Sequence, residues 1–366
     1  MLCPDYYSSF RCKINRCRAA CCNGWPVTFS MRDYFRLLSL NCTEQTKSRL
    51  DRALHLTAHP TEEEYAMILP GYDGNCPMRM KDGRCSIQAE LDESVLPTVC
   101  RLYPRGIREQ EASCSNSCEA VVELLHRKEA IRFIEEESDD KAIHTRRIHF
   151  FETGGREIEI RLWLISFIQD RHYSLPERLY RMGEMLRLLD EALVSHNQER
   201  IHSLLKNEIN VSAVFEKADW HAALQTVCAM LEKLDLLSDN IREYGSIAVS
   251  RLSFGDEEGY SDALLKFRNT VPDWEEWFEN LLVNHMLFTQ FPFQDRPVSL
   301  TEEMTALFSV YALLRFITVG AGNGTVERLV DIIAALFRLV DHTQFDRFAV
   351  SLLHDSSDAN RLLLSV

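Results

Sequence analysis

Cysteine is the residue type whose placement in this chain points most directly to chemistry. Eleven of the twelve cysteines lie among the first 118 of the 366 residues. In a reducing compartment, thiols gathered in this way bind metals more often than they form disulfides. The sequence therefore predicts a metal centre in the N-terminal region, with eight candidate ligands: Cys12, Cys17, Cys21, Cys22, Cys76, Cys85, Cys100 and Cys118.

The spacing of the first motif constrains how its thiols can share a centre. If the stretch after Asn15 is helical, Cys17 and Cys21 lie on one face, while the adjacent Cys22 points about 100° away. We expect Cys21 and Cys22 either to reach one cluster from an irregular turn or to serve two different centres. Cys114 could replace Cys118 as a ligand. The remaining cysteines are interpreted as packed or free thiols: Cys3, Cys42 and Cys228.

Ligand type indicates which metal such a site would hold. Only two histidines, His55 and His59, occur in the first 118 residues, and neither lies in a cysteine motif. Sites made of thiolates alone hold iron–sulfur clusters or structural zinc. The paired Cys-x2-Cys knuckles of zinc ribbons are absent from the sequence, which favours an iron–sulfur cluster, with zinc as the alternative.

Charge and hydropathy exclude several classes of protein. Residues 1–118 carry 15 Lys and Arg against 14 Asp and Glu, so the net charge of -14 belongs to the rest of the chain. An acidic protein of this kind has no general attraction for nucleic acid or anionic lipid. Arg315 interrupts the longest apolar run, residues 305–321, so no membrane-spanning segment is expected. Since no secretory signal is visible, we expect a cytoplasmic protein.

The elements that position these residues are predicted to be mainly helical. Residues 1–118 are rich in turn signals such as Asn23-Gly24 and Asp82-Gly83. We expect residues 1–134 to form an irregular cysteine-rich domain of short helices and loops tied together by metal. An acidic linker is expected over 135–156. Residues 157–366 are expected to form an all-α domain.

Periodicity and capping locate the helices of the second domain. Apolar residues from Ile160 to Ile168 have helical spacing, and Ser174 with Glu177 forms a capping box that begins a helix reaching Leu193. An aromatic stripe from Trp274 to Leu282 is interpreted as core packing. Further amphipathic segments are expected near 198–208, 211–236, 274–290, 301–318, 325–340 and 344–354.

A glycine string, residues 319–324, imitates the loop of a dinucleotide-binding fold. The motif requires a preceding strand and further strand–helix–strand units. Residues 305–318 have helical spacing instead, so we predict a helix–loop–helix connection here.

Several strings resemble one known family, the flagellin lysine N-methylases (FliB family), which carry a CxxCxxCC-type cysteine-rich metal-binding domain. The opening Tyr6-Tyr7-Ser8-Ser9-Phe10-Arg11-Cys12 and the later Gly24-Trp25 resemble the start of these proteins. The other matching strings follow in the family's order: Cys76-Pro77, Cys85, Cys100 to Arg105, Ser117 to Ala120, Ile160-Arg161, Ile168 to Arg171, Leu175 to Leu179, Glu279 to Asn284, Phe291 to Phe293, and Phe337-Arg338 with His342. The chain departs from the family at residues 27–30, where an acidic residue is expected.

This resemblance implies methylation of lysine ε-amines on flagellin, with S-adenosylmethionine as the donor and a [4Fe-4S] cluster bound by the cysteines. The Cys-x3-Cys-x2-Cys triplet of radical enzymes is absent, so the ligands must be arranged differently. The sequence leaves open whether methyl transfer is radical or polar. It also leaves the oligomeric state open.

Within that reading, Arg101 and Arg105 beside Cys100 are candidates for binding the donor's carboxylate, because guanidinium groups hold carboxylates with two hydrogen bonds. Arg338 is a third candidate. Methyl transfer requires a neutral amine, so groups that accept a proton are expected nearby. The candidates for this catalytic role are Tyr103, Tyr311 and His342, the last two sharing helix faces with Arg315 and Arg338; the alternative is that these pairs only join helices.

An alternative hypothesis is that the protein is not an enzyme. Zinc or iron then only stabilises the N-terminal fold, and the acidic helices bind a partner protein.

Overall fold

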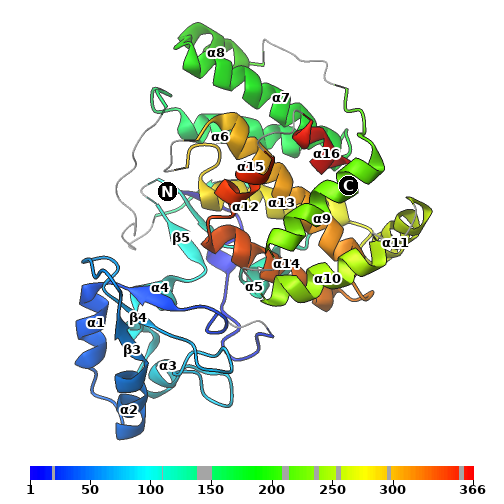
Figure 1. Ribbon diagram of the computed structural model, residues 1–366. Helices are drawn as coiled ribbons and strands as arrows, with labels where there is room; N and C mark the ends of the chain where they lie inside the picture. The colour runs from blue at the N-terminus through cyan, green and yellow to red at the C-terminus, as the bar shows by residue number, and fades with distance from the viewer. Residues whose placement is uncertain are drawn as a thin grey trace. The chain divides into compact units, whose positions relative to one another are not determined.

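The computed structural model describes residues 1–18, 21–108, 110–137, 151–207, 214–234, 239–252, 257–294, 298–353 and 358–366 (Figure 1). The chain forms two compact units. Residues 10–106 are called here the cysteine-rich unit, and residues 1–9 with 107–366 the helical unit. Most of the predicted acidic linker, residues 138–150, lies outside the described residues. The predicted domain boundaries stay predictions.

The cysteine-rich unit is built on a small antiparallel sheet with the strand order β2–β4–β3. Its strands are β2 (Val27–Phe29), β3 (Leu54–Leu56) and β4 (Ala66–Ile68). Ile68 of β4 pairs with Val27 on one side and Leu54 on the other. Around the sheet lie α1 (Met31–Leu38), α2 (Glu44–Ala53), α3 (Ser86–Glu90), the 3-10 turn η2 (Glu93–Val95) and α4 (Thr98–Leu102), and β5 (Arg105–Ile107) follows.

The core of this unit is a single apolar cluster. It contains Phe29, Leu37, Leu50, Ile68 and Met78, all almost fully buried. Polar side chains begin the helices that bring in this core, since Ser30 accepts a hydrogen bond from the Asp33 amide at 3.2 Å and so caps α1. Burial of these side chains gives the unit a hydrophobic centre of its own.

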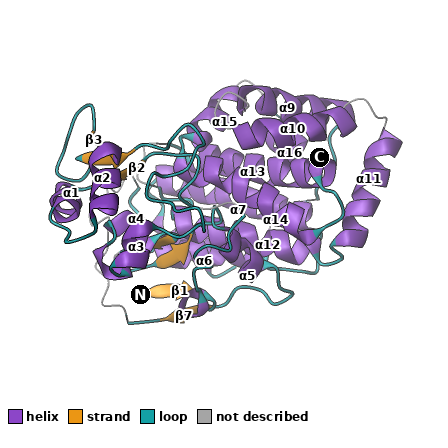
Figure 2. Cartoon of the chain, turned by 90° about the horizontal axis from the view of Figure 1, so that it is seen from below, coloured by secondary structure: helices purple, strands orange, loops and turns teal. Residues whose placement is uncertain are grey.

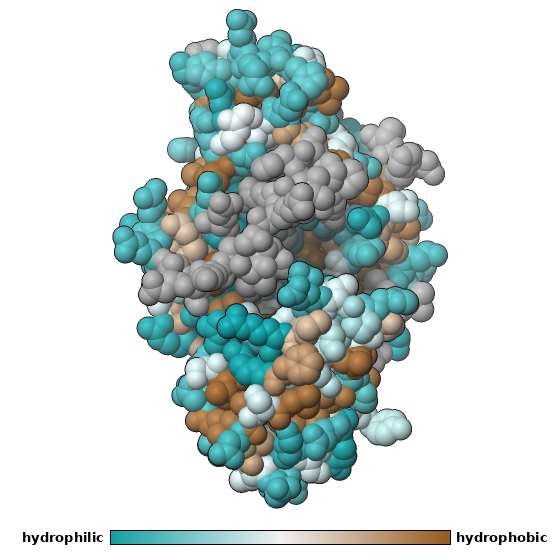
Figure 3. All heavy atoms as spheres, turned by 90° about the vertical axis from the view of Figure 1, so that its left-hand side faces the viewer, coloured by the Kyte–Doolittle hydropathy of each residue, from teal (hydrophilic) through white to brown (hydrophobic). Residues whose placement is uncertain are grey.

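The outer face of α1 carries apolar side chains in contact with solvent. Met31, Phe35 and Leu38 are among the exposed large apolar residues, and 54% of Phe35 is exposed. Figure 3 turns the side on which α1 lies toward the viewer and shows apolar surface there. The amphipathic pattern of α1 is therefore incomplete, because apolar residues lie on both of its faces.

The helical unit gathers most of the helices of the chain. They are α5 (Glu119–Leu125), α6 (Glu157–Ile168), α7 (Leu175–Val194), α8 (Gln198–Leu205), α9 (Trp220–Leu234), α10 (Asp239–Leu252), α11 (Glu257–Thr270), α12 (Trp274–Thr289), α13 (Leu300–Ala321), α14 (Val326–His342), α15 (Phe345–Leu353) and α16 (Ala359–Ser365). Short segments precede or join them, namely β1 (Leu2–Pro4), the 3-10 turn η1 (Tyr7–Ser9), β6 (Ala112–Cys114) and β7 (Phe133–Glu135).

Helix α13 is the central element of this unit (Figure 2). It packs against α7, α10, α14, α15 and α16. By length and composition it could cross a membrane, but 94% of its most apolar window is buried inside the protein. It is apolar all round because it is covered on all sides, as in the core helix of a globular protein.

The first nine residues belong to the helical unit through a strand pair. β1 pairs antiparallel with β7, with Leu2 opposite Glu135 and Pro4 opposite Phe133. Tyr6, which follows β1, is buried and donates a hydrogen bond to Oδ1 of Asn284 on α12. The chain therefore starts in the helical unit, leaves it for residues 10–106 and returns.

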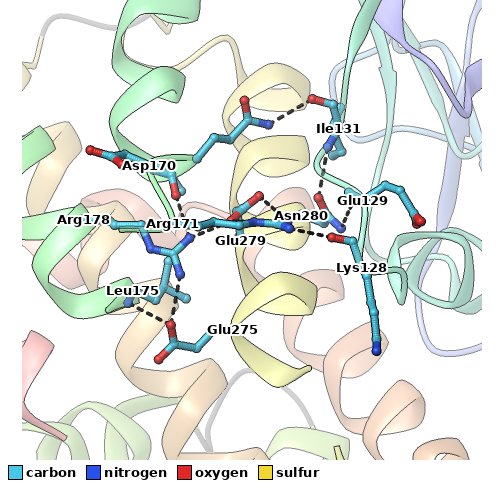
Figure 4. A network of polar contacts seen from close by, with 12 residues as sticks. Lys128, Glu129, Ile131, Asp170, Arg171, Leu175, Arg178, Glu275, Glu279 and Asn280 are labelled. Atoms are coloured by element: carbon cyan, nitrogen blue, oxygen red, sulfur yellow. Dashed lines mark hydrogen bonds and ion pairs between the residues drawn. The ribbon is translucent and has the colours of Figure 1, made fainter. Parts of the chain in front are cut away.

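A buried ion-pair network joins α6, α7 and α12 (Figure 4). The Glu279 side chain on α12 is fully buried and accepts hydrogen bonds from Arg171 at 2.8 Å and from Arg178 at 2.6 Å. Arg178, 3% exposed, also donates to Glu275 at 3.0 Å. A buried carboxylate needs such partners because desolvation of its charge is costly.

The predicted fold class is confirmed, since the protein is mainly helical with a small sheet-containing N-terminal region. The capping box at Ser174 is present, with the Ser174 amide donating to Glu177 at 2.9 Å. The glycine string lies where α13 ends and α14 begins, as the predicted helix–loop–helix requires. The helix expected over 211–236 starts only at Trp220, and residues 214–219 have no regular structure. The expectation of helices and loops alone missed the β2–β4–β3 sheet.

Replacing Glu279 is expected to destabilise the helical unit strongly. Glu279→Gln leaves Arg171 and buried Arg178 without their shared charge partner, so we expect the free energy of unfolding to fall by about 3–5 kcal/mol. Chemical denaturation followed by circular dichroism measures this loss. The matched control is Glu191→Gln, which removes a carboxylate that also has two arginine partners, Arg187 and Arg200, but is 45% exposed. We expect less than about 1 kcal/mol there, and equal losses for the two variants would contradict the assignment.

Candidate functional site

Four cysteines of the cysteine-rich unit come from four separate segments and lie near enough for each to affect the ionisation of others. Cys22 and Cys76 are linked through their backbones, since the Cys76 amide donates to the Cys22 carbonyl at 2.7 Å. Side chains extend this contact, with Asn23 donating to Asn75 at 3.0 Å and Arg79 to Asn75 at 2.6 Å. Cys85 directly precedes α3, and Cys100 lies within α4.

The position of Cys100 is fixed by a buried carboxylate on α1. Asp33, 4% exposed, accepts hydrogen bonds from the Thr98 amide at 3.0 Å and the Thr98 hydroxyl at 3.3 Å. These bonds hold the first turn of α4, and Cys100 lies two residues after Thr98 on that helix. The same carboxylate accepts from Arg36 at 2.6 Å, so α1 and α4 are joined through one residue.

The thiols lie near enough to influence one another's ionisation. Burial raises the pKa of Cys76 to about 11, and the neighbouring Cys22 and Cys85 contribute in the same direction. The pKa of Cys100 is raised well above its usual value, first because surrounding atoms reduce the solvation of its thiolate and then because of Cys76, Cys85 and Cys22. Cys100 still reaches the surface. Several thiolates side by side repel, and a bound cation would relieve this repulsion.

The first motif contributes to the same cluster from an irregular segment. The pKa of the Cys21 thiol is raised, first by a hydrogen bond with Cys22, then by burial and the charges of Cys22, Cys100 and Cys12. Residues 11–18 and 21–22 contain turns and coil but no helix, while residues 19–20 lie outside the described residues. The shared helix face for Cys17 and Cys21 is thus not found where the chain is described, and Cys21 and Cys22 lie in a turn.

The donor set fits a thiophilic metal group. Cys12, Cys21, Cys22, Cys76, Cys85 and Cys100 interact as a group, and thiolates are the ligands of iron–sulfur clusters and of structural zinc. Within the described ranges, no three His, Cys, Asp or Glu side chains are already arranged around a single ion position. All twelve cysteines are thiols rather than half-cystines. The predicted ligands Cys17 and Cys118 stay predictions; Cys118 precedes α5 in the helical unit.

The candidates for binding a donor lie directly after Cys100. Arg101 is in the last turn of α4, and Tyr103 follows it. The Tyr103 ring contacts Trp25 edge-on, with 6.2 Å between ring centroids. The Arg105 guanidinium lies 4.9 Å from the centre of the Phe10 ring. All three predicted residues follow Cys100 within five positions of the chain, and their roles stay predictions.

Tyr311 and Arg315 share a helix face as expected, but they lie in the interior of the helical unit. Arg315 donates to the Tyr311 hydroxyl at 2.9 Å and lies 5.4 Å from the centre of the Trp274 ring. Burial raises the pKa of Tyr311. The aromatic stripe on α12 is core, as predicted, with Trp277, Phe278 and Leu281 fully buried.

His342 lies in a polar cluster that the helical unit assembles from three segments. Its Nε2 atom is 2.9 Å from the Ser117 hydroxyl, and the Ser117 hydroxyl is 2.6 Å from that of Ser115. Ser115 in turn donates to Asp341 Oδ2 at 2.6 Å, and Asp341 Oδ1 is 2.9 Å from Nδ1 of His285. Ser115 and Ser117 are fully buried, whereas His342 is exposed.

Asn284 on α12 holds the segment that carries these two serines. Its amide nitrogen donates to the Cys114 carbonyl and to Asn116 Oδ1, both at 2.7 Å, and its oxygen accepts from Ser113 at 2.6 Å. Asn116 donates back to the Leu281 carbonyl at 2.9 Å. Segment 113–117 is thereby fastened to α12 by bonds that leave the Ser115 and Ser117 hydroxyls directed at α14.

Although His342 reaches the surface, the protein atoms around its ring reduce the solvation of the charged form and so lower the pKa of His342 below its ordinary value. The neighbouring Arg338 acts in the same direction, while Asp341 opposes it. The imidazole is therefore neutral at physiological pH, the state that a proton acceptor needs.

Sequence reasoning identified His342 but missed its partners. Ser115 and Ser117 lie between Cys114 and Cys118, a segment in which the sequence analysis considered only the cysteines. Asp341 is the direct neighbour of His342 in the sequence. His285 lies on the same helix, three residues beyond the stripe that was interpreted as core. The string Ser117 to Ala120 was the available signal, but the contact between Ser117 and His342 joins residues 225 positions apart.

Comparison with known proteins identifies a relationship for the helical unit. A family model described as the FliB lysine N-methylase C-terminal domain matches residues 161–362. The chain matches neither a curated protein nor a solved structure.

The charges near His342 yield a prediction about its titration. Arg338→Gln removes a cation that lowers the pKa of His342, so the pKa should rise. Nuclear magnetic resonance of the histidine ring protons over a pH series measures the shift. Arg328→Gln is the matched control, because Arg328 lies at the other end of α14 and pairs with Glu243 at 3.7 Å. A pKa that does not move in Arg338→Gln, or that moves equally in both variants, would contradict the assignment.

Proposed function

We propose, from the premise that the chain belongs to the FliB lysine N-methylase family, that it transfers methyl groups from S-adenosylmethionine to lysine side chains of flagellin. The reaction takes place in the cytoplasm and depends on an iron–sulfur cluster bound by the cysteine-rich unit. The observation that carries the proposal is the family match over residues 161–362, more than half of the chain.

The cysteine cluster supports the metal part of the proposal. Cys22, Cys76, Cys85 and Cys100 are the residues that would hold the cluster, with Cys12 and Cys21 as neighbours that could replace or extend them. When bound, an iron–sulfur cluster supplies iron that can take up an electron or hold the amino-acid end of a methyl donor.

The residues beside the thiols suit the donor. Arg101 and Arg105 are positively charged, follow Cys100 closely and are half-buried, so either could hold the donor's carboxylate with two parallel hydrogen bonds. Tyr103 packs on Trp25 and so has a fixed ring orientation from which its hydroxyl could accept or donate a proton. Aromatic faces also attract a sulfonium cation.

In the helical unit, His342 is the residue suited to removing the proton from a lysine ammonium. The neutral amine then attacks the methyl carbon of the donor. The nitrogen–carbon bond forms as the sulfur–carbon bond breaks, and sulfur keeps the electron pair. Tyr311 and Arg338 complete the predicted set, but Tyr311 is fully buried and bonded to Arg315.

Metal analysis of single cysteine variants tests the cysteine-rich unit independently of catalysis. After anaerobic purification, the wild-type protein should contain iron and stoichiometric acid-labile sulfide. Cys76→Ser, Cys85→Ser and Cys100→Ser should each lose most of both, because each removes a thiolate ligand. Cys42→Ser is the matched control, since Cys42 is a half-buried cysteine of the same unit outside the cluster, and it should keep its iron.

Incubation of the iron-loaded protein with flagellin and S-adenosylmethionine tests the activity. Mass spectrometry should show flagellin peptides heavier by whole methyl groups, located on lysine. A protein that contains only zinc and leaves flagellin unmodified would overturn the proposal and favour a structural metal in an interaction module.

A further inference from the structure

The hydrogen-bond chain from His342 to Asp341 has a direction that the chemistry of its groups dictates. The Asp341 carboxylate only accepts hydrogen bonds, so the Ser115 hydroxyl is the donor in the 2.6 Å bond to Asp341. This bond uses the one hydroxyl proton of Ser115. Ser115 then has to accept from Ser117 in the other 2.6 Å bond. Because the proton of Ser117 is used there, Ser117 accepts from Nε2 of His342 at 2.9 Å.

The chain ends in a second imidazole. Asp341 Oδ1 lies 2.9 Å from His285 Nδ1, which donates to it, and the Asp341 side chain is fully buried while His285 is 5% exposed. The exposed His342 is therefore linked to a buried carboxylate–imidazole pair by two fully buried hydroxyls. In such a sequence every member can pass one proton to the next without moving more than its hydrogen.

We infer that Ser117 and Ser115 form a proton relay between His342 and the Asp341–His285 pair, which receives the proton that the substrate lysine ammonium must lose. This inference rests on the proposed function. His342 takes a proton from the ammonium and gives its Nε2 proton to Ser117. Ser117 gives its own to Ser115, and Ser115 gives its own to the Asp341 carboxylate. The lysine amine is left neutral, and no group is oxidised or reduced.

The charges that act on the relay residue His342 lie on its own helix. Asp341 and Arg338, both on α14, are the charges that act on His342, and they oppose each other. Helix α12 contributes His285. Of the other helices packed against α14, α5 carries Glu119 and Glu123, α15 carries Asp346 and Arg347, and α13 carries Glu302, Glu303 and Arg315. On α10, Glu243 pairs with Arg328 at the far end of α14.

A relay and a purely structural bridge differ in what loss of a hydroxyl does to His342. Ser117→Ala and Ser115→Ala interrupt the chain, whereas Ser117→Thr keeps a hydroxyl at the same position. Ser113→Ala is the matched control, because Ser113 is a buried serine of the same segment that donates to Asn284 and has no bond to His342. Thermal unfolding identifies variants that fail to fold.

The first readout is the protonation pattern of His342, seen by nitrogen-15 NMR of the full-length protein and assigned with His342→Gln. In the wild type and in Ser117→Thr, the neutral ring should carry its proton on Nε2. In Ser117→Ala we expect a mixture of the two neutral forms. An Nε2-protonated ring in Ser117→Ala would overturn the relay.

The second readout is the pH dependence of flagellin methylation. Ser117→Ala and Ser115→Ala should lower kcat about tenfold to a hundredfold near neutral pH, because they impair but do not remove the acid–base catalysis that contributes about a hundredfold or more. They should also displace the pH profile with little change in KM. Ser113→Ala and Ser117→Thr should keep the wild-type profile. Unchanged profiles in both alanine variants would overturn the relay. If the wild type methylates no lysine at any pH, it is the proposed function that fails, and the NMR comparison still decides whether the hydroxyls couple His342 to Asp341.

Discussion

Buried polar groups need hydrogen-bond or ion-pair partners, and the helical unit depends on this constraint most clearly at α12. Glu279, Asn280, Asn284 and His285 occupy buried positions on a helix whose other buried side chains are apolar. Each is satisfied by a different part of the helical unit. Glu279 pairs with the arginines of α6–α7 and Asn280 donates to carbonyls of residues 125, 127 and 129. Asn284 holds segment 113–117, and His285 contacts Asp341.

The same helix therefore links stability to the polar cluster. An unpaired buried group on α12 would lower the free energy of unfolding by about 1–3 kcal/mol. The segments that hydrogen-bond to these groups are therefore held in position. A second buried pair acts likewise at the end of α12, where Arg161 binds Glu111 and donates to the Phe291 and Gln290 carbonyls at 2.7 and 2.8 Å. Many of the strings that resemble the FliB family, including Arg161, Arg171 and Arg178, thus belong to the scaffold that positions the site.

The sequence predicted the features that depend on residues close to one another along the chain. The capping box at Ser174, the stripe on α12 and the helical character of residues 305–318 follow from spacing within one helix. The sheet of the cysteine-rich unit was missed because its strands span three residues each, too short for alternation to show. The partners of His342 and Glu279 were missed because each bond joins residues more than a hundred positions apart, except for Asp341 and His285, 56 apart. The thiols were found by type, but their grouping depends on backbone bonds such as that between Cys22 and Cys76.

The pairing of β1 with β7 affects how the protein is made. The first strand leaves the ribosome more than a hundred residues before its partner, so it must wait while the whole cysteine-rich segment is synthesised. That segment is an insertion within the helical unit, with an entry and an exit rather than one tether. Cutting the gene at residue 106 would therefore not separate two independent pieces, because the downstream product would lack its opening strand and Tyr6. A separable helical unit requires residues 1–9 to be rejoined to residue 107 by a short artificial connection.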